Sequence, residues 1–132
     1  MHERRFHGNL KMLRTPDRVK LLEVERVIKL CLETFSAQTV LDVGTGTGLF
    51  AEGFTAQGLE VTGIDANPEM IEAARRFVPQ AHFRQAPAEL LPYPEAAFDL
   101  VFLGLVLHET DGALAALTEA RRVARLGVAV PE

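Results

Sequence analysis

The sequence predicts an α/β fold, a doubly wound and mainly parallel sheet with helices on both faces. Three features predict it: short β-rich runs alternate with helical patterns four times, the first run ends in a glycine-rich turn, and the second ends at Asp65. Alternation of this kind joins parallel strands through right-handed crossovers, which place helices over both faces of the sheet. A chain of 132 residues is long enough for one such domain and too short for two.

A helix is predicted before the first strand. Thr15-Pro16 has the pattern of an N-cap followed by proline at the first helical position. The apolar residues that follow have the spacing of one buried helix face: Val24, Val27, Ile28, Cys31 and Phe35. We expect this helix to end near Ser36.

The first half of the sheet alternates strand and helix twice. The predicted elements are a strand over 39–43, a helix over 49–57, a strand over 60–64 and a helix that opens at Asn67-Pro68. Gly58 ends the first of these helices as a C-cap, and Pro79 ends the second. The inner face of the second helix is expected to hold Met70, Ile71, Ala74 and Phe77.

The second half predicts two more strands and the opening of a fifth. Its predicted elements are a weaker strand over 82–86, a proline-containing loop over 87–97 and an almost wholly apolar strand over 98–103. Such an apolar run is typical of a central strand covered on both faces. Asp111 is expected to cap a last helix with the inner positions Leu114, Leu117, Ala120 and Val123. Residues 127–130 open a fifth strand, where the chain stops.

Charge and length exclude several classes of partner. The first thirty residues have a net charge of +4, and the remainder a net charge of −8. The basic residues lie on a helical pattern without interleaved aromatics, so we expect a solvated helix face and no nucleic-acid partner. The longest apolar run, 100–107, is far shorter than the roughly 20 residues that span a bilayer. No signal peptide is visible, so we expect a cytoplasmic protein without a membrane partner.

Cysteine and histidine spacing predicts no metal site. Cys31 is the single cysteine, which excludes an internal disulfide and a cysteine-based metal cluster. Its place on the apolar helix face indicates a small core side chain. His2, His7 and His82 lie far apart in the sequence and lack the spacing of metal ligands.

The candidate ligand site lies where the first two strands end. Ligands of doubly wound sheets bind beyond the carboxyl ends of the strands. The glycine-rich turn 44–48 lets a ligand approach the backbone, and the helix that follows offers free N–H groups to an anion. Asp65 ends the second strand 21 residues after Gly44, where a carboxylate can accept hydrogen bonds from ribose hydroxyls. The alternative for Asp65 is a turn residue or helix cap before Asn67.

The spacing of the glycines separates two cofactor classes. A dinucleotide-binding G-x-G-x-x-G turn would need glycine or alanine where the chain has Leu49. The chain has G-x-G-x-G instead, with Asp42 two residues before it. The segment 40–48 resembles the first motif of the class I S-adenosylmethionine-dependent methyltransferases, in the type 11 or ubiquinone/menaquinone-methyltransferase-like branch. Further motifs in the expected order are similar to this family over about 37–130: 61–65 with 67–70, 91–94 with 98–99, and 106–108.

The resemblance implies S-adenosylmethionine as cofactor. It implies that the glycine turn holds the methionine part, Asp42 lies near its ammonium, and Asp65 binds the ribose. It also implies that residues 103–105 line the floor of the pocket near the sulfonium. The cofactor-binding residues implied are Asp42, Gly44, Thr45, Gly46, Gly48, Asp65, Ala66, Ala88, Glu89 and Leu103. Ala88 and Glu89 would lie beside adenine, but Pro87 stands where the family commonly has an aspartate that accepts from the adenine amino group.

The resemblance also divides the chain and names one proton-transfer candidate. Residues 1–36 would form an N-terminal helical lid segment and 37–132 the cofactor-binding core. His108 has a suitable pKa for a base, although a structural imidazole is the favoured alternative, because methyl transfer to a positioned nucleophile needs no protein base. Asp99 begins a buried strand and is expected to be a structural acceptor rather than a catalyst.

The predicted function is methyl transfer from S-adenosylmethionine to a small-molecule acceptor. A nicotinamide-dependent oxidoreductase is the alternative enzyme, and a non-catalytic S-adenosylmethionine-binding module is the alternative without turnover. The family's sheet usually continues beyond a fifth strand, so three interpretations of the ending stay open. The chain is a truncated piece of a longer enzyme, which is favoured, or a domain completed by a homodimer through the uncovered sheet edge, or a degenerate binding module.

Overall fold

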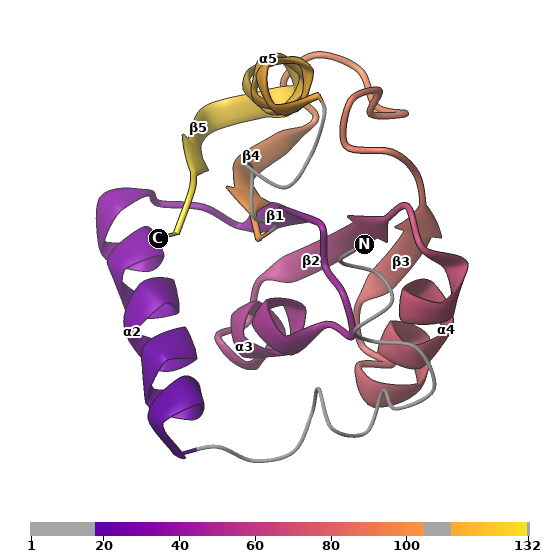
Figure 1. The fold of residues 1–132 in the computed structure, drawn as a ribbon. Coiled ribbons are helices and arrows are strands. Elements are labelled where there is room, and N and C mark those ends of the chain that lie inside the picture. Colours follow the sequence, from indigo (N-terminus) through magenta and orange to yellow (C-terminus); the bar gives the residue numbers. More distant parts are fainter. Residues whose placement is uncertain (1–17, 105–111, 132) are drawn as a thin grey trace.

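The described residues form a sheet of five strands, all parallel, in the order β3-β2-β1-β4-β5 (Figure 1). A computed structural model describes residues 18–104 and 112–131. The strands are β1 Thr39–Val43, β2 Glu60–Asp65, β3 His82–Gln85, β4 Phe98–Leu103 and β5 Ala124–Ala129. The strand order reverses between β1 and β4, which is the switch point of a doubly wound sheet. The predicted fold class is therefore confirmed.

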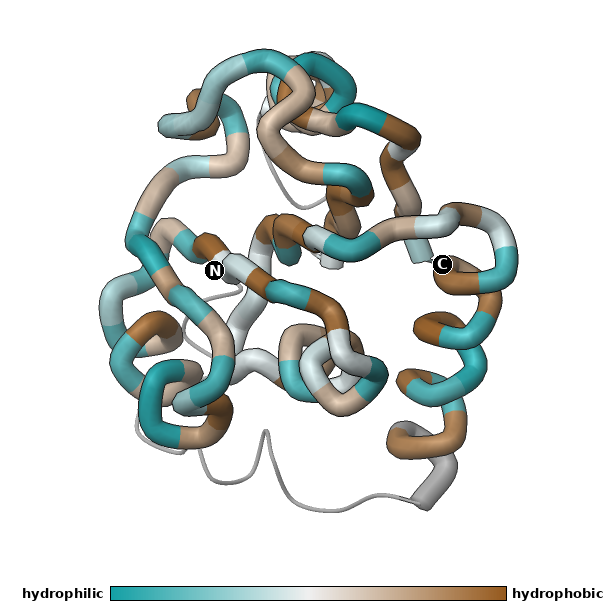
Figure 2. Tube along the Cα trace, turned by 180° about the vertical axis from the view of Figure 1, so that it is seen from behind, coloured by the Kyte–Doolittle hydropathy of each residue, from teal (hydrophilic) through white to brown (hydrophobic). Residues whose placement is uncertain are grey.

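Within the described residues, four helices cover the two faces of this sheet unequally. Helices α2 (Arg18–Thr34), α3 (Leu49–Ala56) and α4 (Pro68–Phe77) lie on one face, and α5 (Ala113–Val123) lies on the other (Figure 1). Figure 2 shows hydrophobic residues concentrated in the strands and on the side of α2 that faces them. The helix predicted before the first strand is confirmed from Arg18 onward, while its expected cap at Thr15-Pro16 lies outside the described residues.

Strand β4 is buried on both faces, as its apolar sequence predicts. Leu100 and Phe102 pack into the core beneath α2, α3 and α4, whereas Val101 and Leu103 pack into the core beneath α5. Because side chains alternate along a strand, one six-residue run supplies both cores. Strand β4 thus joins the two halves of the interior.

Helix α4 begins as predicted and turns one side chain differently. Asn67 is its N-cap, and its side-chain oxygen accepts from the N–H of Glu69 at 2.9 Å. The buried positions follow the spacing Ile71, Ala74 and Val78. Phe77 is one residue, about 100°, away from that stripe and is 36% exposed. The prediction that Phe77 faces the core is wrong.

Helix α5 faces the sheet with the predicted positions Leu117, Ala120 and Val123, of which Leu117 is partly buried, but not with Leu114. Its fully buried residues are Ala116, Ala120 and Val123, while Leu114 is 79% exposed. Leu114 precedes Ala116 by two residues, which places it on the far side of the helix. The prediction that Leu114 faces inward is therefore wrong. Asp111, the expected cap, lies outside the described residues, and Gly112 is the N-cap.

The fifth strand starts earlier than predicted. Ala124, the C-cap of α5, is already extended, with φ −85° and ψ 134°, and is also the first residue of β5. The start expected at Gly127 is wrong, because parallel pairing with β4 begins at Ala124, opposite Phe98. The edge of the sheet on this side is consequently β5 and not β4. No helix within the described residues is long and apolar enough to cross a membrane.

Candidate functional site

The glycine turn between β1 and α3 has the backbone that its sequence predicts. Gly44, Gly46 and Gly48 all have left-handed φ angles, of 76°, 58° and 89°. The N–H groups of Gly44 and Thr45 both donate to the carbonyl of Ile64, at 2.9 and 2.8 Å, which ties the turn to the end of β2. A Cβ at Gly46 would meet no atom of the described residues within 4 Å, so these residues leave the space above it open to a ligand.

Asp42 lies under this turn with half of its carboxylate unsatisfied. The residue is 1% exposed, and its Oδ2 accepts from the hydroxyl of Thr45 at 2.8 Å. Its Oδ1 is buried and has no hydrogen-bond partner among the described residues. Burial raises the pKa of Asp42 to about 7, and the negative charge of Asp65 adds to the rise. The bond from Thr45 and, more weakly, the N–H of Ala51 oppose it, although no N–H of the described residues makes a hydrogen bond of good geometry to Oδ1. A buried acceptor without a partner is unfavourable until a donor reaches it.

Gly104, which follows the last residue of β4, lies beside Oδ1 of Asp42. Its N–H donates to the carbonyl of Val43 at 2.9 Å, and a Cβ there would lie 3.2 Å from Asp42 Oδ1. Leu103, the residue that the resemblance implies near the sulfonium, is fully buried in the core beneath α5. Gly104 lies in the middle of the segment 103–105 that the resemblance implies near the sulfonium. The sequence signal for this residue is a glycine directly after an otherwise apolar strand.

Asp65 connects the glycine turn to the start of α4. Its Oδ2 accepts from the N–H of Gly46 and its Oδ1 from the N–H of Asn67, each at 2.9 Å. A carboxylate has about four acceptor positions, so about two remain for a ligand. The turn-residue interpretation of Asp65 is confirmed by these bonds, and it leaves room for the ribose-binding interpretation. Ala66 follows as an exposed residue, and its carbonyl accepts from the Gln85 side chain at 3.1 Å.

The segment after β3 passes close to Asp65. The N–H of Ala86 donates to the carbonyl of Asp65 at 3.1 Å. Ala88 is half-buried against the core beneath α5, and Glu89 is exposed. The side chain of Glu89 occupies the space that a Cβ at Gly112 would need. The structure thus brings the glycine turn, both aspartates and the start of this segment to the carboxyl edge of the sheet, as predicted.

The remaining candidates lie elsewhere or outside the described residues. His108, His2 and His7 lie outside them, so the role of His108 stays a prediction. Asp99 lies at the amino edge of the sheet, where it accepts from the N–H groups of Gln38 and Thr39 and from Arg125. Its structural interpretation is confirmed. Across residues 18–104 and 112–131, no group of three or more metal-ligating side chains is placed to hold an ion.

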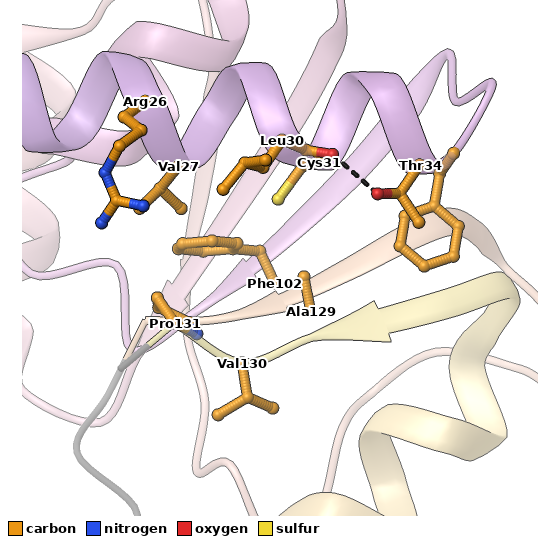
Figure 3. A pocket seen from close by; sticks show the side chains of 10 residues that line it. Arg26, Val27, Leu30, Cys31, Thr34, Phe102, Ala129, Val130 and Pro131 are labelled. Atoms are coloured by element: carbon orange, nitrogen blue, oxygen red, sulfur yellow. Dashed lines mark hydrogen bonds between the residues drawn. The ribbon is translucent and has the colours of Figure 1, made fainter.

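A hollow of about 340 Å³, which the sequence did not predict, lies between α2 and the β4–β5 pair (Figure 3). Val27, Leu30 and Phe102 line it, and the Arg26 side chain reaches its rim (Figure 3). The ring of Phe102 lies 4.7 Å from that of Phe50, in the first turn of α3. The hollow therefore shares an aromatic wall with the helix that follows the glycine turn. Figure 3 also shows that Val130 points away from α2.

Comparison with known proteins gives the same picture as this geometry. The model of a family described as "Methyltransferase domain" matches residues 41–130. The chain is 37% identical over 90 residues to a malonyl-[acyl-carrier protein] O-methyltransferase of Serratia marcescens, covering 68% of this chain and 35% of that protein. It is 35% identical over 89 residues to a demethylmenaquinone methyltransferase of Chlorobaculum parvum, covering 67% and 37%.

The solved structures agree. The crystal structure of a SAM-dependent methyltransferase from Aquifex aeolicus superposes with a TM-score of 0.74 and 28% identity, covering 89% of this chain and 66% of that one. The chain spans little more than a third of the length of the two relatives named above. The family resemblance that the four motifs predict is confirmed: this chain belongs to the methyltransferase domain family.

Proposed function

We propose that this chain binds S-adenosylmethionine at the carboxyl edge of its sheet and is the cofactor-binding part of an enzyme that methylates a small molecule. The observation that carries the proposal is the buried, unpartnered Oδ1 of Asp42 beside Gly104, under an open glycine turn. An enzyme site is where an unsatisfied buried acceptor is tolerated, because the ligand supplies the missing donor.

The residues present fit the cofactor. Its ammonium group brings a positive charge and three N–H donors, which match an acidic oxygen that lacks a partner. The turn at Gly46 is open, so the methionine part can lie against the backbone there. The acceptor positions left on Asp65 suit the two ribose hydroxyls. When bound, the cofactor supplies a sulfonium whose methyl group is ready for in-line transfer, so the protein's task is to position the two reactants.

The hollow beside α2 supports a small-molecule acceptor. Its volume of about 340 Å³ falls within the range of about 300–1,000 Å³ that is usual for small-molecule pockets. Its apolar lining suits an apolar acceptor, and Arg26 at the rim suits an anionic substituent. Phe102, which lines the hollow, also lies 3.5 Å from the position of a Cβ at Gly104, the residue beside Asp42 Oδ1. The nicotinamide alternative is not proposed, since the family match and the G-x-G-x-G spacing both favour S-adenosylmethionine.

We also propose a cytoplasmic protein that binds neither nucleic acid nor membranes, and a homodimer through the edge of the sheet. The free thiol of Cys31 suits a reducing compartment. In the part of the chain that the structure describes, β5 pairs with β4 on one side, and we propose that the backbone groups of its other side pair with a second copy. Light scattering at increasing concentration measures whether that pairing occurs.

Calorimetric titration of this chain tests the cofactor assignment. We expect saturable binding of S-adenosylhomocysteine and no heat with the nicotinamide dinucleotide. Asp65→Ala removes the proposed ribose acceptor and should weaken S-adenosylhomocysteine binding by about tenfold or more. Glu60→Gln, an exposed acidic residue at the other end of the same strand, is the matched control and should bind like the unaltered chain. Binding of the dinucleotide with none of S-adenosylhomocysteine would overturn the proposal.

A further inference from the structure

Two charged residues of α5, Glu119 and Arg122, make a compact set of hydrogen bonds to the segment that leads from β3 to β4. The guanidinium of Arg122 donates to the carbonyls of Tyr93 at 2.8 Å and Leu91 at 3.0 Å. It also donates to both carboxylate oxygens of Glu119, at 2.7 and 2.9 Å. Glu119 in turn accepts from the N–H of Leu91 at 2.8 Å. Both backbone groups of Leu91 are therefore held by this one pair of side chains.

This pair supplies hydrogen-bond partners to backbone groups in a segment without secondary structure. Residues 86–97 form no helix or strand, so their backbone groups need other partners. The planar guanidinium binds two carbonyls and a carboxylate at once, an arrangement for which a lysine has the wrong geometry. The side chain of Leu91 is 3% exposed and packs beneath α5, so its side chain and its backbone are fixed together. Leu91 is the anchor of the segment.

A second anchor lies five residues earlier, at the candidate site. The N–H of Ala86 donates to the carbonyl of Asp65, the proposed ribose-binding residue. Residues 87–90 therefore form a short bridge between Asp65 and Leu91. Within the described part of the chain, the N–H groups of Ala88 and Glu89 donate to no protein acceptor, which leaves them for a ligand.

The composition of this bridge makes its backbone path important. Pro87 has no N–H and no polar side chain, and Ala88 and Leu90 have apolar side chains. Apart from the Glu89 carboxylate, the polar groups that the bridge offers to a ligand are therefore backbone groups. A backbone group is aimed by the anchors on either side of it, and cannot adjust as a long side chain does. The placement of Ala88 and Glu89 thus depends on Leu91, and hence on Arg122 and Glu119.

We propose that Glu119 and Arg122 are positioning residues that hold the 87–90 bridge so that its backbone recognises the adenine base of the cofactor. This inference rests on the proposed function and adds to it the part of α5 that controls base recognition. Neither side chain touches the cofactor in this proposal, and both act through Leu91.

The chain offers a matched control three residues away. Arg125 donates to Asp99 Oδ1 at 2.8 Å, an arginine–carboxylate pair of the same chemical type at the amino end of β4. Arg125→Met therefore removes a comparable pair without touching the segment 86–93. Arg122→Met removes the hydrogen bonds from Arg122 to Leu91, Tyr93 and Glu119 and keeps the length of the apolar stem.

The experiment compares two ligands that differ in the base. S-adenosylhomocysteine and S-inosylhomocysteine are titrated into the unaltered chain, Arg122→Met and Arg125→Met, at a temperature where circular dichroism shows each to be folded. We expect the unaltered chain and Arg125→Met to prefer adenine by the same factor. In Arg122→Met we expect affinity for S-adenosylhomocysteine to fall by about tenfold and the preference to approach unity. Arg122→Lys should recover only part of it.

Each result has one meaning. A purely structural role for Arg122 weakens both ligands by the same factor and leaves the preference intact, and that result would overturn the inference. Should Arg122→Met not fold, Glu119→Gln keeps the shape and the bond from Leu91 but weakens the pair, and an unchanged preference there is equally contrary. If the unaltered chain binds neither ligand, the proposed function itself is wrong. If the unaltered chain binds S-adenosylhomocysteine and the adenine preference is the same in Arg122→Met, this inference alone is wrong.

Discussion

The two edges of the sheet use aspartate differently. At the amino edge, Asp99 accepts from the N–H groups of Gln38 and Thr39, at 2.9 and 3.3 Å, and from Arg125 at 2.8 Å. At the carboxyl edge, Asp42 is more deeply buried, yet one of its oxygens has no partner among the described residues. The two residues are on adjacent strands, β1 and β4, and the contrast arises from the deeper burial of Asp42 and the larger number of donors around Asp99.

The pKa values of the two groups shift in opposite directions for this reason. Hydrogen bonds from Gln38 and Arg125 lower the pKa of Asp99, so its carboxylate favours the folded state. Burial raises the pKa of Asp42 to about 7, so its ionised form disfavours the folded state. Asp99, whose carboxylate accepts hydrogen bonds from the start of β1 and from β5, stabilises the fold. Asp42, which has a buried oxygen without a partner among the described residues, destabilises it when ionised. Stability and ligand binding are thus assigned to opposite ends of the same strands.

The largest effect we predict comes from exchanging each aspartate for asparagine. Asp42→Asn removes the charge that faces the cofactor's ammonium and should weaken S-adenosylhomocysteine binding by about 100-fold. The same variant should unfold at higher urea concentration at pH 8, because no buried charge remains. Asp99→Asn should behave oppositely, with stability lower by about 1 kcal/mol and unchanged affinity. Calorimetry and urea unfolding of both variants measure this. Equal affinity losses in the two variants would remove the contrast.

The second prediction concerns pH. The pKa of Asp42 is raised above its unfolded value near 4, so its contribution to stability is complete below pH 4 and is lost as pH rises through about 7. The unliganded chain should therefore be more stable at pH 5.5 than at pH 8. Affinity for S-adenosylhomocysteine should change in the other direction, rising about tenfold from pH 6 to pH 8, because the ammonium binds the ionised form. In Asp42→Asn, urea unfolding and calorimetric titration over the same pH range should show neither the loss of stability nor the rise in affinity. A pH dependence that persists in this variant would belong to another group.

The smallest predicted effect tests Gly104. A methyl group at this position would lie 3.2 Å from Asp42 Oδ1, close enough to narrow the approach to that oxygen. Gly104→Ala should weaken S-adenosylhomocysteine binding by about fivefold, corresponding to about 1 kcal/mol of overpacking. Gly58→Ala is the control: Gly58 has φ 88° and open surroundings, so this variant should lose stability while keeping its affinity. An unchanged affinity in Gly104→Ala would place the cofactor elsewhere.

Much of the fold was predictable because local chemistry determines it. The cap at Asn67, the glycine turn and the apolar run of β4 each act within a few residues, and all three are confirmed. The errors lie where packing selects among apolar residues. Of the inner positions predicted for α5, Ala120 is buried as expected, but the close contact with the sheet also selects Ala116 and leaves Leu114 exposed.

The site divides in the same way. Asp42 and Asp65 are visible in sequence because a strand, a glycine turn and a second strand bring them to one edge at fixed spacing. The clamp on Leu91 is not visible, because Arg122 follows it by 31 positions and is brought to it only by the crossover through α5. The closeness of Gly104 to Asp42 Oδ1 is also not visible in the sequence, because it is a contact between the ends of two neighbouring strands.

The direct junction at Ala124 has a mechanical consequence. Because no residue separates α5 from β5, the helix and the edge strand cannot shift independently. Arg122 lies just before this junction and Arg125 just after it, one gripping the segment near the nucleoside site and the other gripping the base of β4. A ligand that immobilises the segment therefore restrains the outermost strand as well. The backbone amides of β5 should exchange with deuterium more slowly once the cofactor site is filled.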